Sequence, residues 1–254
     1  MARLKFTCAY DGSPFCGWQS QRGGETVQDT IEQAMAAIVK EPLRVAASGR
    51  TDAGVHAHAQ CFHADVPEVC RLSTENWLAA MNAHLPAAIR ITEVAAVADD
   101  FHARFSAVGK EYEYVICRAA VLSPFLHQRV WHVPHSFDSG MLAAAMKVYE
   151  GEHDFRRFAA NRGNEPAEPP TDFYIRTIYS ARMEEEGDIL RLRVHGNGFM
   201  YRMVRLLVGT AHQVARGRMS LETLETMLQQ PLGDKTRYCA PACGLYLRRV
   251  HYKA

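Results

Sequence analysis

Apolar and polar residues alternate in the first half of the chain in a pattern that predicts six elements. Apolar residues at every second position indicate strands, and an apolar stripe at helical spacing indicates a helix. The predicted elements are a strand at 4–10, a helix within 25–42, strands at 43–48 and 55–64, a helix within 73–86 and a strand at 89–97. The order is strand-helix-strand-strand-helix-strand.

The same order recurs in the second half. Its predicted elements are a strand at 110–118, a helix at 137–151, strands at 174–183 and 189–195, helices at 199–216 and from Ser220, and a strand at 244–250. Two such halves indicate an α+β fold of two ferredoxin-like domains, with mainly antiparallel sheets joined across a central cleft. We place the domains at 1–104 and 105–254.

The composition of the chain indicates which broad class of protein it belongs to. The chain has 254 residues, of which 48% are apolar, enough for one large domain or two ordinary ones. No window reaches the ~18 uninterrupted apolar residues of a membrane span, and the N-terminus lacks the pattern of a signal peptide. The seven cysteines form no CxxC pair. We therefore expect reduced thiols and a cytoplasmic protein without a membrane segment.

Charge is unevenly distributed although the net charge is only +1. Residues 191–254 carry +8, and the remainder carries −7. Alternation places Arg191, Arg193 and His195 on one face of their strand, and helical spacing places Arg202, Arg205, His212 and Arg216 on one stripe. A basic region of this kind is typical of a surface that binds a polyanion such as a nucleic acid. It is equally typical of a basic surface that only contacts solvent.

The segment "SGRTDAGVHAHA", residues 48–59, holds one carboxylate between two glycines. Glycine permits a sharp turn between strands, so Asp52 is expected at the rim of the sheet. An aspartate in a turn commonly bonds only its own backbone, which is the structural alternative. Arg50 lies two residues earlier, and a neighbouring guanidinium keeps a carboxylate ionised, as a nucleophile or base requires.

Four possible zinc ligands follow this loop: His56, His58, Cys61 and His63. In a strand, side chains alternate between faces, so the first two point to one side and the last two to the other. Four ligands divided in this way cannot complete one tetrahedron. We therefore predict no metal site here and expect the histidines to pack and to form hydrogen bonds.

Several motifs together resemble a known family. "GRTDAGVHA" is similar to the signature of the TruA family of tRNA pseudouridine synthases. The resemblance extends through "YDGSPFCGWQSQ", "TVQDTIEQAM", "DFHARFSA", "KEYEY", "GEHDFRRF", "GNGFMYRMVRLLVG" and "GLYL". It implies two ferredoxin-like halves with a basic cleft, and a homodimer in which each tRNA touches both subunits. It also implies isomerisation of uridine to pseudouridine at positions 38, 39 and 40, in the anticodon stem and loop of tRNA, with no cofactor or metal.

The resemblance also implies site residues. Asp52 matches the catalytic aspartate, and Tyr112 matches the tyrosine that stacks on the flipped base. Arg205 matches the arginine that pairs with the aspartate, Leu245 an apolar wall of the uracil pocket, and Arg50 an arginine that helps to open and bind the RNA. Arg202, Arg216 and Arg193 are then expected to bind RNA.

The chain departs from the family pattern in two places, and two other functions are compatible with its sequence. Glu111 and Glu113 stand where some relatives carry basic residues, and the proline-rich loop at 161–172 receives no role from the resemblance. A non-catalytic RNA-binding module or RNA chaperone would use a basic cleft but has no need of Asp52. A nucleoside hydrolase normally pairs two carboxylates about 5–10 Å apart, and no second acid accompanies Asp52 in its motif.

Overall fold

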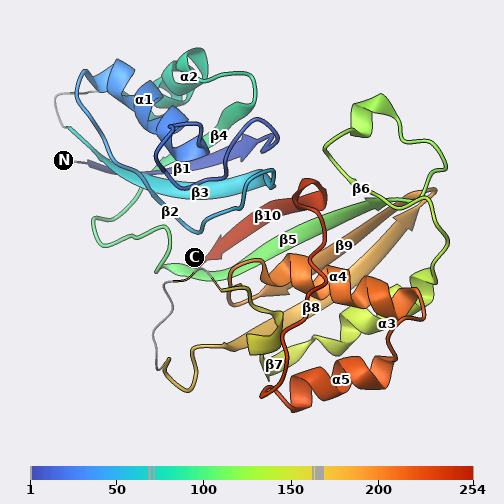
Figure 1. Ribbon diagram of the computed structural model, residues 1–254. Coiled ribbons are helices and arrows are strands. Elements are labelled where there is room, and N and C mark those ends of the chain that lie inside the picture. Colours follow the sequence, from blue (N-terminus) through green and yellow to red (C-terminus); the bar gives the residue numbers. More distant parts are fainter. Residues whose placement is uncertain (1, 68–69, 71, 162, 164–168, 254) are drawn as a thin grey trace. The chain divides into compact units, whose positions relative to one another are not determined.

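Figure 1 shows a computed structural model of the chain, which describes residues 2–67, 70, 72–161, 163 and 169–253. Within the predicted loop at 161–172, residues 162 and 164–168 lie outside the described residues. The chain forms two compact units. Unit 1 comprises Met1–Val108 and Tyr246–Ala254, and unit 2 comprises Gly109–Leu245.

Unit 1 contains the predicted strand-helix-strand-strand-helix-strand order. Its elements are β1 (Ala2–Tyr10), α1 (Val27–Val39), β2 (Ala46–Ala47), β3 (His56–Val66), α2 (Thr74–His84) and β4 (Ile89–Ala96), and it also holds all but the first residue of β10 (Leu245–Tyr252). The strands lie in the order β4-β1-β3-β10, and β1 is antiparallel to both β3 and β4. Helices α1 and α2 cover one face of this sheet (Figure 1).

The outer edge of β3 is shared by two strands. The two-residue β2 pairs antiparallel with β3 at His63 and Phe62, whereas β10 pairs in parallel with His56 and Ala57 at the beginning of β3. Because β2 is so short, the edge next to the loop at 48–55 is left for β10. The sequence pattern assigned the last strand to the second half, and the structure pairs it with β3 of unit 1.

Large aromatic side chains form the core of unit 1. The rings of Phe6 and Phe62 stack at 4.9 Å between centroids, and Trp77 meets Phe6 edge-on at 5.9 Å. Trp18 is 1% exposed and lies 6.0 Å from both Phe62 and Tyr10. Rings of this size bury enough apolar surface to dominate the stability of a core. The segment that carries Trp18 is thereby fixed to the sheet.

Unit 2 has the second set of elements. They are β5 (Ala107–Cys117), η1 (Pro124–Leu126), β6 (Trp131–His132), α3 (Ser139–Val148), β7 (Gly151–Asp154), η2 (Arg156–Phe158), β8 (Ile175–Glu186), β9 (Ile189–Gly196), α4 (Met203–Ala215), α5 (Leu221–Gln229) and η3 (Ala242–Gly244). The first two residues of β5 belong to unit 1. The strands lie in the order β5-β9-β8-β7, all antiparallel, and β6 pairs with β5. The α+β class with mainly antiparallel sheets is thus confirmed.

Side-chain caps explain where several helices begin. Hydroxyl or carboxylate oxygens of Thr26, Ser73, Asp138 and Ser220 accept backbone N–H groups in the first turns of α1, α2, α3 and α5. Helix α4 lacks such a cap and begins at Met203, later than the predicted residue 199, because Arg202 has a left-handed backbone with φ of 58°. None of the helices in the described residues has the length and apolar content that crossing a membrane requires.

Candidate active site

The loop between β2 and β3 presents Asp52 on a tight turn. The N–H of Val55 donates to the carbonyl oxygen of Asp52 at 3.1 Å, and Gly54, the third residue of the turn, has φ of 75°. A type II turn requires positive φ at this position, which glycine adopts without steric cost. Thr51 and Val55 are buried, whereas Asp52 is partly exposed. The turn therefore places a partly exposed carboxylate between two buried residues.

The start of the loop is fixed to β3. The Ser48 hydroxyl donates to Oε1 of Gln60 at 2.7 Å, and Nε2 of Gln60 donates to the carbonyl oxygen of Gly49 at 2.9 Å. The Ser48 N–H also donates to the carbonyl oxygen of Cys61 at 2.8 Å. Ser48 and Gln60 are fully buried, so these bonds are shielded from water. The backbone that leads to Asp52 is consequently well defined.

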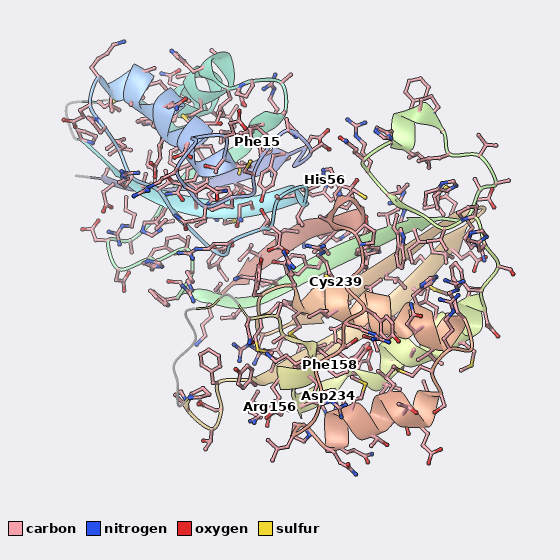
Figure 2. All side chains as sticks on the ribbon, viewed as in Figure 1. Phe15, His56, Arg156, Phe158, Asp234 and Cys239 are labelled. Carbon is pink, nitrogen blue, oxygen red and sulfur yellow. The ribbon has the colours of Figure 1, made fainter. Side chains whose placement is uncertain are left out.

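The histidines of β3 lie on the faces that the alternation predicts. The rings of His56 and His58 both stack on Tyr246 of β10, at 4.6 and 5.0 Å between centroids. Figure 2 labels His56, which is buried and whose Nδ1 accepts the N–H of Gly12 at 3.0 Å. These residues pack and form hydrogen bonds, as predicted.

Cys61 and His63 belong to the other face of β3. Cys61 lies 3.7 Å from the Thr7 hydroxyl, and Nδ1 of His63 accepts the N–H of Ala103 at 3.2 Å. Burial lowers the pKa of His63 below its usual value. Within the part of the chain that the structure describes, no group of three or more His, Cys, Asp or Glu side chains is placed to hold a metal ion.

Three of the expected site residues belong to unit 2. Tyr112 on β5 is 9% exposed, and its ring meets Phe199 edge-on at 5.1 Å. Arg205 on α4 donates from Nε to the carbonyl oxygen of Ala240 at 2.8 Å, and the N–H of Ala240 donates back to the carbonyl oxygen of Arg205. Leu245 is buried at the beginning of β10. Asp52 and Arg50 belong to unit 1, where Arg50 is exposed.

The expected RNA-binding arginines differ in their surroundings. Arg202 and Arg216 are exposed at the two ends of α4, and the Arg202 guanidinium lies 5.0 Å from the Tyr201 ring. Arg193 instead contacts two carboxylates, Glu113 at 3.0 Å and Glu184 at 2.7 Å. The expected stripe is exposed at Arg202 and Arg216, whereas Arg205 is partly buried and His212 is buried. That residue is 3% exposed, because its ring is covered by Trp131 and Phe137.

Comparison with known proteins decides the family. The model of the family described as tRNA pseudouridine synthase matches residues 7–106 and 145–253, which include the Asp52 loop, Arg205 and Leu245. Tyr112 lies outside the matched segments. The chain belongs to the tRNA pseudouridine synthase family.

Individual relatives agree along the whole length. A tRNA pseudouridine synthase A of Akkermansia muciniphila is 48% identical over 99% of this chain and 96% of its own length. Those of Geobacillus kaustophilus and Listeria monocytogenes are 41% and 40% identical, covering 99% and 100% of this chain and 95% and 100% of the relatives. One chain of a solved Cbf5-Nop10-Gar1 complex matches at 15% identity over 83% of this chain and 44% of its own, with a TM-score of 0.34, which is too low to bear on the argument.

A tRNA pseudouridine synthase is an isomerase that converts uridine to pseudouridine, and this chain is an enzyme of that class. The reaction exchanges one bond of the sugar for another and needs no net oxidation or group donor. The Asp52 turn holds one carboxylate at a defined point of its loop. Sequence reasoning found this carboxylate but gave no role to Tyr10, Gly12 and Gly17, although they lie in the motif "YDGSPFCGWQSQ".

Proposed function

We propose that this pseudouridine synthase acts on uridines 38, 39 and 40 in the anticodon stem and loop of tRNA, with Asp52 as its catalytic residue. The family supplies the class of reaction, and the names of the full-length relatives supply tRNA as the substrate. The observation that carries the role of Asp52 is its tight turn, in which Asp52 is partly exposed while Thr51 and Val55 are buried.

The proposed chemistry conserves every atom of the uridine. The N1–C1′ bond breaks, the uracil rotates, C5 bonds to C1′, and the proton on C5 is transferred to N1 through the active site. Asp52 acts either by attacking C1′ or by removing the proton on C2′ to give a glycal. In both routes the Asp52 carboxylate is ionised before the reaction begins. Neither route requires a cofactor or metal.

Other residues have supporting roles in this proposal. Tyr112 stacks on the extruded base, for which an aromatic ring contributes about 1–3 kcal/mol. Leu245 packs against the uracil, Arg205 supports the chemical step, and Arg50 binds the RNA. Arg202 and Arg216 are exposed and therefore remain proposed phosphate contacts. We omit Arg193 from this group because two carboxylates already hold its guanidinium.

The test is to incubate the protein with an unmodified tRNA transcript and to map pseudouridine by carbodiimide-stop sequencing. We expect stops at positions 38–40 with the wild-type protein and none with Asp52→Asn. A transcript in which those uridines are replaced by cytidine is the substrate control. Pseudouridine formed only elsewhere in the tRNA would contradict the proposed site, and activity retained by Asp52→Asn would contradict the catalytic role.

We propose further that the enzyme is a cytoplasmic homodimer that binds each tRNA through both subunits. Support comes from the family resemblance and from seven cysteines that are all free in the structure, as reducing compartments favour. Light scattering coupled to size-exclusion chromatography tests the dimer. A mass near that of one 28.5 kDa chain at micromolar concentration would contradict it.

A further inference from the structure

The backbone of residues 10–18 lies directly against the Asp52 turn. A Cβ atom built on Gly17 would lie 2.8 Å from the carbonyl oxygen of Thr51 and 3.0 Å from the backbone nitrogen of Ala53. One built on Gly12 would lie 2.0 Å from the carbonyl oxygen of Val55. Any side chain at these two positions would displace the loop, so the two glycines contact it on both sides of Asp52.

Two hydrogen bonds join the same segment to Thr51. The N–H of Trp18 donates to the carbonyl oxygen of Thr51 at 3.0 Å, and the hydroxyl groups of Tyr10 and Thr51 are 2.8 Å apart. Tyr10 is 4% exposed and Thr51 is 7% exposed, so this hydroxyl pair is shielded from water and out of reach of a tRNA. Since Trp18 lies in the aromatic core of unit 1, movement of the loop would disturb that core.

We propose that Tyr10 and Gly17 are positioning residues for the isomerisation, acting through Thr51 on the Asp52 carboxylate. Neither residue touches the substrate. The Tyr10 hydroxyl fixes the side chain of Thr51, and Gly17 permits the close approach that fixes its carbonyl group. A displacement of about 1 Å in a reacting group costs on the order of a hundredfold in rate. The inference rests on the proposed catalytic role of Asp52.

The hydroxyl pair is tested by a double-mutant cycle in the full-length protein. Tyr10→Phe and Thr51→Val each remove one hydroxyl at nearly constant volume, and Thr51→Ser keeps it. We expect the single-turnover rate at saturating tRNA to fall about tenfold in each of the first two variants, a loss typical of one buried hydrogen bond. The double variant should lose little more than either single variant, because the same interaction is removed. Thr51→Ser should retain most of the rate.

Gly17 has a matched control in the same segment. Gly17 and Gly24 have positive φ, 91° and 73°, so alanine strains the backbone at both. A Cβ on Gly24 meets nothing within 4 Å, whereas one on Gly17 meets the Asp52 turn. We expect Gly17→Ala to lower the single-turnover rate by about a hundredfold, and Gly24→Ala to remain close to wild type. The dissociation constant for tRNA should stay within a few-fold in both.

Two further measurements distinguish failure of the positioning inference from failure of the catalytic role of Asp52. They are the tRNA affinity of each variant and the single-turnover rate of Asp52→Asn. If Asp52→Asn is active, the proposed catalytic role fails. If Asp52→Asn is inactive while Tyr10→Phe, Thr51→Val and Gly17→Ala react at the wild-type rate, the positioning inference alone is overturned. It is also overturned if each loss of rate is matched by an equal loss of tRNA affinity or of folded protein in thermal unfolding. Should Gly17→Ala fail to fold, the double-mutant cycle decides the question.

Discussion

Arg193 and Glu113 face each other across neighbouring strands, with Nε of the guanidinium 3.0 Å from Oε2 of the carboxylate. The Glu113 side chain is only 5% exposed, and Arg191 approaches its other oxygen at 3.3 Å. The hydrogen bond that Arg193 donates to the Glu113 carboxylate raises the pKa of the Arg193 guanidinium above its usual value. Part of the positive charge of residues 191–254 is thus neutralised within the sheet and is not available to bind phosphate.

We expect Arg193→Ala and Arg216→Ala to behave differently. Loss of Arg193 weakens the support of a buried carboxylate, so the free energy of unfolding should fall by about 1–3 kcal/mol with little change in tRNA binding. Loss of the exposed Arg216 should leave stability unchanged and flatten the log–log salt dependence of binding by up to about 0.9. Urea unfolding and binding isotherms at several salt concentrations measure both. If Arg193→Ala and Arg216→Ala flatten the salt dependence of tRNA binding equally, then Arg193 also contacts the RNA.

Asp52→Asn and Asp52→Ala should abolish isomerisation and leave tRNA affinity within a few-fold of wild type. Asparagine keeps the shape of the side chain but cannot carry the negative charge that either route requires. Single-turnover assays with excess enzyme measure the chemical step, and filter binding measures affinity. Substantial turnover in either variant would show that another group performs the reaction.

The activity of Tyr112 variants should depend on whether the new side chain has an aromatic ring. Phenylalanine keeps the stacking surface and the edge-on contact with Phe199, so we expect partial activity. Leucine removes the ring, and with it about 1–3 kcal/mol of stacking on the base, so activity should nearly vanish. Single-turnover rates of both variants, with thermal unfolding as the control for the buried position, test this. A leucine variant as active as the wild type would remove Tyr112 from the site.

The sequence pattern predicted features that depend only on residues close together along the chain. Alternation along β3 correctly placed His56 and His58 on one face, as their shared contact with Tyr246 shows. It also placed Arg193 on the polar face of its strand, but the pairing of Arg193 with Glu113 depends on strand register, which one sequence does not reveal. The contact between Tyr10 and Thr51 joins residues 41 positions apart and leaves no local pattern.

Helical spacing was misleading at His212 for a related reason. The spacing places this residue in line with Arg205 and Arg216, and on an isolated helix the stripe would be solvated. Trp131 and Phe137, from outside the helix, cover the ring of His212. Arg202 lies before the first turn of α4, since its left-handed backbone ends the preceding loop. Tertiary packing determines which part of a periodic stripe reaches solvent.

Arg205→Ala should depress the single-turnover rate far more than it depresses tRNA affinity. Its guanidinium is held by the carbonyl oxygen of Ala240, a fixed position that suits alignment of a reacting group better than a mobile phosphate contact. Arg216→Ala is the matched control, because it removes an exposed arginine at the other end of α4. If Arg205→Ala shows only a loss of affinity equal to that of Arg216→Ala, then Arg205 is a phosphate contact.

The stability of the protein should decrease in mild acid because of His212. Burial, together with Arg216 and Arg218, lowers the pKa of His212 from 6.5 to about 4, and neither ring nitrogen has a hydrogen-bond partner among the described residues. The folded protein therefore keeps this ring neutral at pH values where the unfolded chain protonates it. Stability is fully present above pH 6.5 and is lost as the pH falls from about 6.5 to about 4.

Between pH 7.5 and pH 5 this single group should cost about 2 kcal/mol of unfolding free energy, since each unit of pKa difference is worth about 1.4 kcal/mol. Other groups titrate in the same range, including His63, so the comparison must be made against a variant. His212→Phe preserves the ring contacts with Trp131 and Phe137 and removes the titration. We expect the urea midpoint of the wild type to fall further between the two pH values than that of His212→Phe. Equal shifts in the two proteins would mean that protonation of His212 does not contribute to the unfolding equilibrium.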